Sequence, residues 1–358
     1  MTEGQGRGGI INMGNTCYAN ATLQAFRNCG KIPWIFEKGR FDTLFRPVET
    51  VKEGRAKQQA LAKTFADVIQ LLQQCKRGQS VRPADFWEKF RVAVADTGFD
   101  HLAQKIPHDS HEFYLFLLDC LHESMAQDTT MKITRGPPVT ELEKHRIAAL
   151  ETWKREFENK YSPLVDLFYG LQHIVVKCET CGNKSHRWEI FSALKATVPS
   201  KPQDGKPPSL AAMLQEEFKP ETIEDYVCDA CAPKRTVATK STAIWRLPLH
   251  TVIVLKRFTP DGRKIQTPMA ALNPVEPFSF EPFFSAESPE RGGETRFALH
   301  SIVDHHGVSG GGHYTAQCKA GATDGWIMYD DESCQPLPGA KPIFGSSTYM
   351  LWFQRVLY

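Results

Sequence analysis

Hydrophobic and polar positions change their period along the chain, and the change separates a helical part from a strand-rich part. Over residues 56–75 apolar side chains recur every three or four positions, which predicts an amphipathic helix. Helices are also predicted from Cys17 to about residue 28, over 84–90 and over 113–121. The last of these is apolar nearly all round, so we expect it to be buried.

Two signals refine this helical part. Asp109 and Glu112 precede the buried helix at the spacing of a capping box, in which an N-cap side chain and an N3 glutamate each bond the other's backbone N–H. Residues 141–161, after a loop-like stretch over 128–140, form a charged amphipathic helix. Its apolar stripe is expected to pack on its own domain, with docking of a partner as the alternative.

From Leu164 onward the pattern is typical of strands. Runs rich in β-branched and aromatic residues are found over 171–177, 252–258, 296–303, 314–319, 326–329 and 349–356. Residues 199–208 and 285–295 are expected to be loops. The sequence therefore predicts a helical N-terminal lobe, a middle insert and a C-terminal sheet.

Composition narrows the class of protein. The chain has 358 residues, 41% hydrophobic and 23% charged, as in ordinary soluble domains. Its 43 Lys+Arg and 41 Asp+Glu give a net charge of +2 without a run of like charge, so we expect neither a nucleic-acid binder nor a membrane protein. The first residues lack a basic or apolar signal segment. We therefore expect reduced cysteines and a cytoplasmic or nuclear location.

A thiol, an imidazole and a carboxylate occur in the order Cys17, His313, Asp330, which are the parts of a cysteine-protease triad. A cysteine at a helix N-terminus beside a histidine is activated because its thiolate is stabilised there. Taken alone, Cys17 would more often be simply buried.

The histidine and the carboxylate are expected to meet across a β-hairpin. Residues 320–325 read as a turn, and pairing Cys318 with Gly325 places His313 directly opposite Asp330. A slip of one residue would send the two side chains to opposite faces.

An acyl-transfer site also needs donors for the developing oxyanion. The Cys17 N–H and the side-chain amide of Asn12 are candidates, and an ordinary turn residue is the alternative for Asn12. Residues 307–312 are glycine-rich and form either a substrate-gating loop or a plain surface turn. The adjacent His305 and His306 should point to opposite faces of a strand, and we expect structural or surface roles for them.

Two Cys-x-x-Cys pairs lie in the middle insert, Cys178/Cys181 and Cys228/Cys231. Two such turns can supply four thiolates to one tetrahedral zinc ion. The 46 residues between the pairs exceed the spacing of a compact zinc ribbon, so four reduced cysteines without metal remain the alternative.

Taken together, these segments resemble the ubiquitin-specific protease family of deubiquitinating cysteine peptidases. Residues 9–20 are similar to the family's cysteine box, and 311–316 with 326–331 to its histidine box. Further similar blocks lie at 108–113, 164–181, 226–231 and 247–258. The blocks occur in the family's order from about residue 9 to 355.

The resemblance implies an α+β, papain-like cysteine peptidase fold with a thumb, a palm and zinc-bearing fingers. It implies a single catalytic domain with a flexible tail (1–8), a mainly helical thumb lobe (9–165), fingers with the zinc knuckles (166–250) and a palm sheet carrying the His/Asp box (251–358). One structural Zn²⁺ would be held by the four cysteines.

The resemblance also implies roles for the site residues. Cys17 would be the nucleophile, His313 the general base, Asp330 the orienting carboxylate and Asn12 an oxyanion donor, with Asp331 a second, supporting acid. The reaction would be thiol-dependent hydrolysis at the C-terminal glycine of ubiquitin or ubiquitinated proteins.

The basic C-terminal tail of ubiquitin, Arg-Leu-Arg-Gly-Gly, would pass between the lobes. Asp109 and Glu112 would bind it by carboxylate–guanidinium pairing, in competition with their capping role, and Tyr314 would wall the diglycine channel or else be a core aromatic. His108 stands where the family more often has Gln.

Three other functions stay open at this point. They are a catalytically silent ubiquitin-binding scaffold, a protease for a ubiquitin-like modifier and a general papain-like peptidase. The sequence does not determine linkage preference, an activating partner or the oligomeric state.

Overall fold

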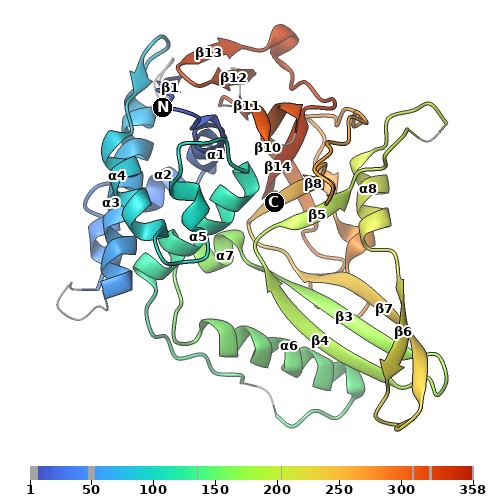
Figure 1. Cartoon of the computed structure of the whole chain (residues 1–358). Helices are drawn as coiled ribbons and strands as arrows, with labels where there is room; N and C mark the ends of the chain where they lie inside the picture. Colours follow the sequence, from blue (N-terminus) through green and yellow to red (C-terminus); the bar gives the residue numbers. More distant parts are fainter. Residues whose placement is uncertain are drawn as a thin grey trace.

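The computed structural model describes residues 7–46, 53–134, 136–202, 204–308, 310–321 and 325–356. Figure 1 shows a group of helices on one side, a large sheet beside it and a second, smaller sheet that projects away from both. The helices run as α1 (Cys17–Arg27), α2 (Ile32–Ile35), α3 (Glu53–Gln74), α4 (Ala84–Val94), α5 (Ser110–Met125), α6 (Glu141–Phe157), α7 (Leu164–Phe168) and α8 (Leu210–Glu217).

Helix α1 is buried along its whole length, because it lies between the other helices and the large sheet (Figure 1). Phe26 on this helix packs against Tyr114 of α5 with ring centroids 5.6 Å apart, and against Trp352 of the sheet at 5.0 Å. The helix that begins with Cys17 is therefore fixed from both lobes.

Helix α5 begins as predicted, but only half of the predicted capping box forms. The Asp109 side chain accepts hydrogen bonds from the backbone N–H groups of His111 and Glu112, which satisfies two orphan donors of the first turn. The Glu112 carboxylate instead contacts His101 Nε2 at 3.1 Å. The glutamate thus faces away from the cap.

The large sheet has eight strands within the described residues. Its order is β13 (Ser333–Pro336), β12 (Trp326–Asp330), β11 (Gly311–Lys319), β10 (Arg296–Val308), β14 (Thr348–Arg355), β8 (His250–Lys256) and β5 (Leu194–Thr197), with β9 (Phe278–Ser279) paired to β10. Helix α1 lies against β11 and β10 on one face, and α8 packs beside β5.

The predicted register of the β11–β12 hairpin is wrong by two residues. Cys318 pairs with Ile327 instead of Gly325, and Ala316 pairs with Tyr329. A shift of two residues keeps every side chain on its face of the sheet. His313 and Asp330 are therefore diagonal neighbours, not direct partners, and still lie within reach of each other.

The smaller sheet has the strand order β4 (Lys184–Phe191), β3 (Gly170–Cys178), β7 (Arg235–Arg246) and β6 (Glu221–Val227). Helix α6 lies across it (Figure 1) and packs back on its own domain through Ala149, Trp153 and Phe157, which are buried. Leu150, on the same helix, is exposed.

The chain start is tied to the helical group. Strand β1 (Gly9–Ile10) pairs in parallel with β2 (Ser80–Val81), and the Gly8 carbonyl accepts a hydrogen bond from the Gln24 side chain at 3.0 Å. Of the predicted tail 1–8, the structure describes Arg7 and Gly8, and both form hydrogen bonds.

Candidate active site

Cys17 is the first residue of α1, at the end of a turn built by Asn12. The Asn12 side-chain oxygen accepts the backbone N–H groups of Gly14 at 2.9 Å and Thr16 at 3.2 Å. Gly14 has φ +101°, a conformation that favours glycine. This turn aims the helix N-terminus, and with it the Cys17 thiol, at β11.

His313 and Asp330 meet as predicted. His313 Nε2 lies 2.5 Å from Asp330 Oδ1, and both side chains remain partly exposed. A carboxylate at Nε2 fixes the imidazole orientation and leaves Nδ1 as the nitrogen available to a thiol. Next to His313, Gly312 allows β11 to lie close to β10, since a Cβ there would lie 2.3 Å from the His306 carbonyl oxygen.

The Cys17 thiol is buried. Cys17 is 5% exposed, and burial raises its pKa, with the charge of Asp331 adding to the rise and the Tyr314 backbone opposing it. Between the described Cys17 and His313 side chains no hydrogen bond forms. Cys17 and His313 thus belong to neighbouring segments, α1 and β11, without a direct hydrogen bond between their side chains.

Asp331 is held by two side-chain amides. Asn12 Nδ2 donates to its Oδ2 and Asn20 Nδ2 to its Oδ1, both at 2.7 Å. Ligand atoms of His313, Asp330 and Asp331 also lie within 4.8 Å of one another. The second acid therefore links the imidazole–carboxylate pair to the Asn12 amide.

A cavity of about 450 Å³ lies between α5 and the palm strands. Its lining combines Asp109 and Glu112 of α5 with Tyr314 of β11, the three substrate-binding residues that the resemblance implied. His305 also lines it and is buried, whereas His306 is exposed. The two histidines do point to opposite faces, and His305 belongs to the cavity wall.

The two acids of the cavity, Asp109 and Glu112, differ in how many hydrogen-bond acceptor sites their carboxylates have free. Asp109 Oδ1 is occupied by the two capping N–H groups, and its Oδ2 accepts the Tyr349 hydroxyl at 2.6 Å. Glu112 has one side-chain contact among the described residues, to His101. Glu112 therefore retains more acceptor capacity for an incoming cation.

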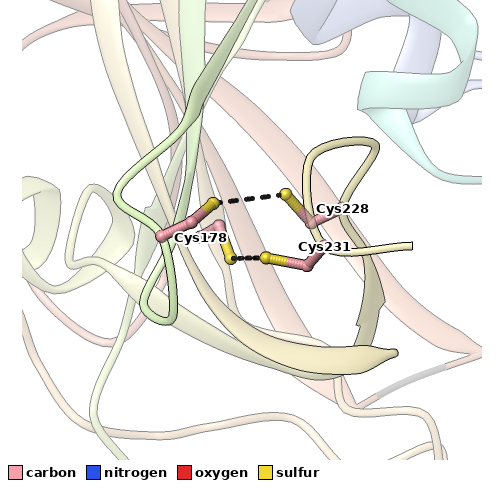
Figure 2. Close-up of side chains that lie close together, drawn as sticks. Cys178, Cys228 and Cys231 are labelled. Carbon is pink, nitrogen blue, oxygen red and sulfur yellow. Dashed lines mark hydrogen bonds between the residues drawn. The ribbon is translucent and has the colours of Figure 1, made fainter. Parts of the chain in front are cut away.

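The four predicted cysteines come together at the far end of the small sheet, and Figure 2 shows Cys178, Cys228 and Cys231 facing one another. The Cys178–Cys231 and Cys181–Cys228 sulfur distances are 4.0 and 3.6 Å. A tetrahedral zinc ion with Zn–S bonds of about 2.3 Å separates its sulfurs by about 3.8 Å. This cluster has the donors and spacing to hold a zinc ion.

Some site residues were not found by sequence reasoning. Asn20, one helical turn after Cys17, could have been found from the i, i+3 spacing that places both on one helix face. Tyr349 and His101 gave no sequence signal, since each reaches the site only through the fold.

A thiol at a helix N-terminus, facing an imidazole–carboxylate pair across two lobes, defines a papain-like cysteine peptidase site. The family model for ubiquitin carboxyl-terminal hydrolase matches residues 8–353, so the chain belongs to this family. The resemblance to ubiquitin-specific proteases is thereby confirmed.

Curated relatives carry the same family name. The chain is 28% identical over 375 residues to ubiquitin carboxyl-terminal hydrolase 4 of Saccharomyces cerevisiae (strain S288c), covering 97% of this chain and 39% of the relative. It is 29% identical over 369 residues to ubiquitin carboxyl-terminal hydrolase 21 of Homo sapiens, covering 98% and 62%. The chain thus spans less than two thirds of the length of either relative.

Solved structures confirm the expected α+β fold with thumb, palm and fingers. The yeast SAGA DUB module with a mutant Sgf73 gives a TM-score of 0.70 at 18% identity, covering 100% of this chain and 70% of that chain. A SAGA DUB module of Ubp8, Sgf11, Sus1 and Sgf73 bound to monoubiquitin gives 0.70 at 20% identity, covering 100% and 71%.

Proposed function

We propose that this chain is a deubiquitinase that hydrolyses the peptide or isopeptide bond at the C-terminal glycine of ubiquitin. One observation carries the proposal: Cys17 at a helix N-terminus, the His313–Asp330 pair and an acid-lined cavity lie together at the junction of the two lobes. Family membership supports the choice of ubiquitin as substrate.

In the proposed reaction, the ubiquitin tail brings its last carbonyl carbon to Cys17. His313 Nδ1 accepts the thiol proton as the sulfur attacks, and Asp330 stabilises the imidazolium through Nε2. His313 then gives the proton to the departing amine, leaving a thioester. A water molecule, deprotonated by His313, hydrolyses the thioester and frees the thiol.

The oxyanion would be stabilised by the Cys17 backbone N–H and by Asn12. One Asn12 amide hydrogen is bound by Asp331, and the second can be donated to the oxyanion. Asp331 in this role is a positioning residue, because it acts through Asn12.

The basic tail of ubiquitin suits the cavity beside α5. We assign the main guanidinium contact to Glu112, because the oxygens of Asp109 are engaged by the helix cap and Tyr349. Asp109 would then act mainly by fixing α5, and Tyr314, which is nearly buried, would wall the channel.

A single zinc ion held by Cys178, Cys181, Cys228 and Cys231 would have a structural role. The S₄ donor set and the sulfur spacing support it, and four protein ligands leave no position open for catalysis. A hydrogen bond with the Thr236 hydroxyl is the main cause that lowers the pKa of Cys178 to about 6, which favours the thiolate form that a zinc ligand needs.

The proposed location is the cytoplasm or the nucleus. None of the ten cysteines is joined in a disulfide, as is usual for proteins of the cytosol and nucleus. In the described part of the chain no helix has the length and apolarity needed to cross a membrane.

The test is hydrolysis of ubiquitin carrying a fluorogenic C-terminal amide, with Cys17→Ala as control. We expect release by the wild type, none by the variant and unchanged ubiquitin binding by the variant. Release from a ubiquitin-like modifier but not from ubiquitin would identify a modifier protease instead. Binding of ubiquitin without turnover would identify a scaffold.

A further inference from the structure

A second group of metal-binding side chains lies away from both the catalytic site and the four cysteines. His145 of α6, His186 of β4 and Glu287 of the loop after Ser285 each offer a ligand atom, and these atoms lie within 4.8 Å of one another. We propose that His145, His186 and Glu287 form a second site for zinc or a similar divalent transition-metal ion.

The donors are of the right kind and nearly at the right spacing. Two imidazole nitrogens and a carboxylate oxygen form a common zinc-ligand set. His145 Nδ1 lies 2.7 Å from Glu287 Oε2. Bonds of about 2.0–2.1 Å in a tetrahedral site place ligand atoms about 3.3 Å apart, so His145 Nδ1 and Glu287 Oε2 must move apart to admit the ion.

An outer partner already orients one ligand. His173 Nε2 lies 2.9 Å from His186 Nδ1, and His173 Nδ1 lies 2.9 Å from the Ser285 hydroxyl. Metal-bound histidines usually donate their second ring N–H to such a partner. With its Nδ1 engaged, His186 presents Nε2 as the ligating nitrogen. His173 Nε2 can act as this acceptor when its Nδ1 donates to the Ser285 hydroxyl.

The rings of His145 and His186 are stacked, with centroids 3.8 Å apart and planes 25° from parallel. An ion bound by both must lie near each ring plane. Binding therefore requires rotation of the His145 imidazole. This rotation breaks the hydrogen bond between His145 and Glu287, and both side chains then bind the same metal ion. His145 and Glu287 have side-chain exposures of 19% and 34%, so solvent and ions can reach them.

The position of the site suggests what the ion does. His145 continues the buried stripe of Ala149, Trp153 and Phe157 by one turn toward the start of α6, where the apolar contacts end. Metal binding would join this first part of α6 to the finger strand β4 and to the loop at Glu287. The helix would then be fixed at both ends.

The experiment measures metal content of the intact protein after equilibration with buffered zinc. We expect two equivalents in the wild type and one in both His145→Gln and His186→Gln. His101→Gln is the matched control, because His101 also pairs with a carboxylate, Glu112, at 3.1 Å but belongs to no group of three metal-ligating side chains among the described residues. It should keep two equivalents.

Cobalt substitution separates the two sites in the same protein. Cobalt at the four cysteines gives thiolate charge-transfer absorption, whereas the second equivalent should add only d–d bands, which His145→Gln removes. Added zinc should also raise the Tm of the wild type more than that of His145→Gln. Three results would overturn the proposal and leave a hydrogen-bonded cluster. The wild type could bind only one equivalent of zinc at saturation, or His145→Gln and His186→Gln could each keep two equivalents. The third is a loss of zinc in His101→Gln equal to that in the two variants.

Discussion

Asn20→Ala removes one of the two amides that hold Asp331 and leaves the nucleophile, the base and the orienting acid in place. The lost contact is 2.7 Å long and ends on a carboxylate. A hydrogen bond to a charged group contributes about 1.5–3 kcal/mol. If that energy keeps Asp331, and through it Asn12, aligned in the transition state, kcat should fall about 10- to 100-fold.

The assay is steady-state hydrolysis of the fluorogenic ubiquitin amide, with kcat and KM determined separately. Asn20 does not line the cavity, so KM and ubiquitin affinity in a Cys17→Ala background should stay near the wild-type values. The loss in kcat should also appear at every pH of the working range, because no titrating group is removed.

Asn28→Ala is the matched control. The Asn28 amide also joins the end of α1 to the palm, donating to the His300 carbonyl at 2.8 Å and the Ser301 hydroxyl at 3.1 Å, but it makes no contact with Asp331. We expect Asn20→Ala and Asn28→Ala to lower the Tm by similar amounts, but only Asn20→Ala should lower kcat strongly. Equal kcat values for Asn20→Ala and Asn28→Ala would refute the positioning chain from Asn20 to Asn12.

Three further predictions concern the acids and the zinc cluster. Glu112→Gln should raise KM for the ubiquitin amide by about 10-fold or more, because it removes the charge that binds a guanidinium. Asp109→Asn should mainly lower the Tm, because it weakens the helix cap. A large rise in KM for Asp109→Asn and only a lower Tm for Glu112→Gln would contradict our assignment. Asp331→Asn removes a negative charge that raises the Cys17 pKa, so the pH profile of Cys17 alkylation by iodoacetamide should move to lower pH. A profile that stays in place or moves to higher pH would contradict this. Cys178→Ser should lower the Tm and the bound zinc without changing the alkylation rate of Cys17, so full retention of the Tm would contradict a structural role.

The sequence was sufficient for the parts of the site that depend on local pattern. The helix beginning at Cys17 and the cap at Asp109 follow from residue types at fixed offsets, and both are present. The His313–Asp330 contact was predicted with a wrong register, yet it forms because the error was two residues and the strand period is two. An error of one residue would have separated the pair.

Other parts depend on contacts that no local pattern encodes. Strand β6 is largely exposed on both faces, so it lacks the alternation that marks a strand, and it was not predicted. The Tyr349 hydroxyl reaches Asp109 from 240 positions away and donates to Oδ2, the oxygen that the helix cap does not use. Glu112 lies in the first turn of α5, as predicted. Its carboxylate contacts His101, and that contact depends on the segment before the helix.

The site combines two opposing effects in one carboxylate. Asp331 holds the Asn12 amide at 2.7 Å, which favours the oxyanion, and its negative charge raises the Cys17 pKa, which disfavours a thiolate in the free protein. Burial of the thiol acts in the same direction. Both effects disfavour the thiolate of Cys17 in the free protein. In the proposed mechanism His313 takes the proton as the sulfur attacks, so the gain from a well-held oxyanion donor would be obtained in the transition state, where it raises kcat.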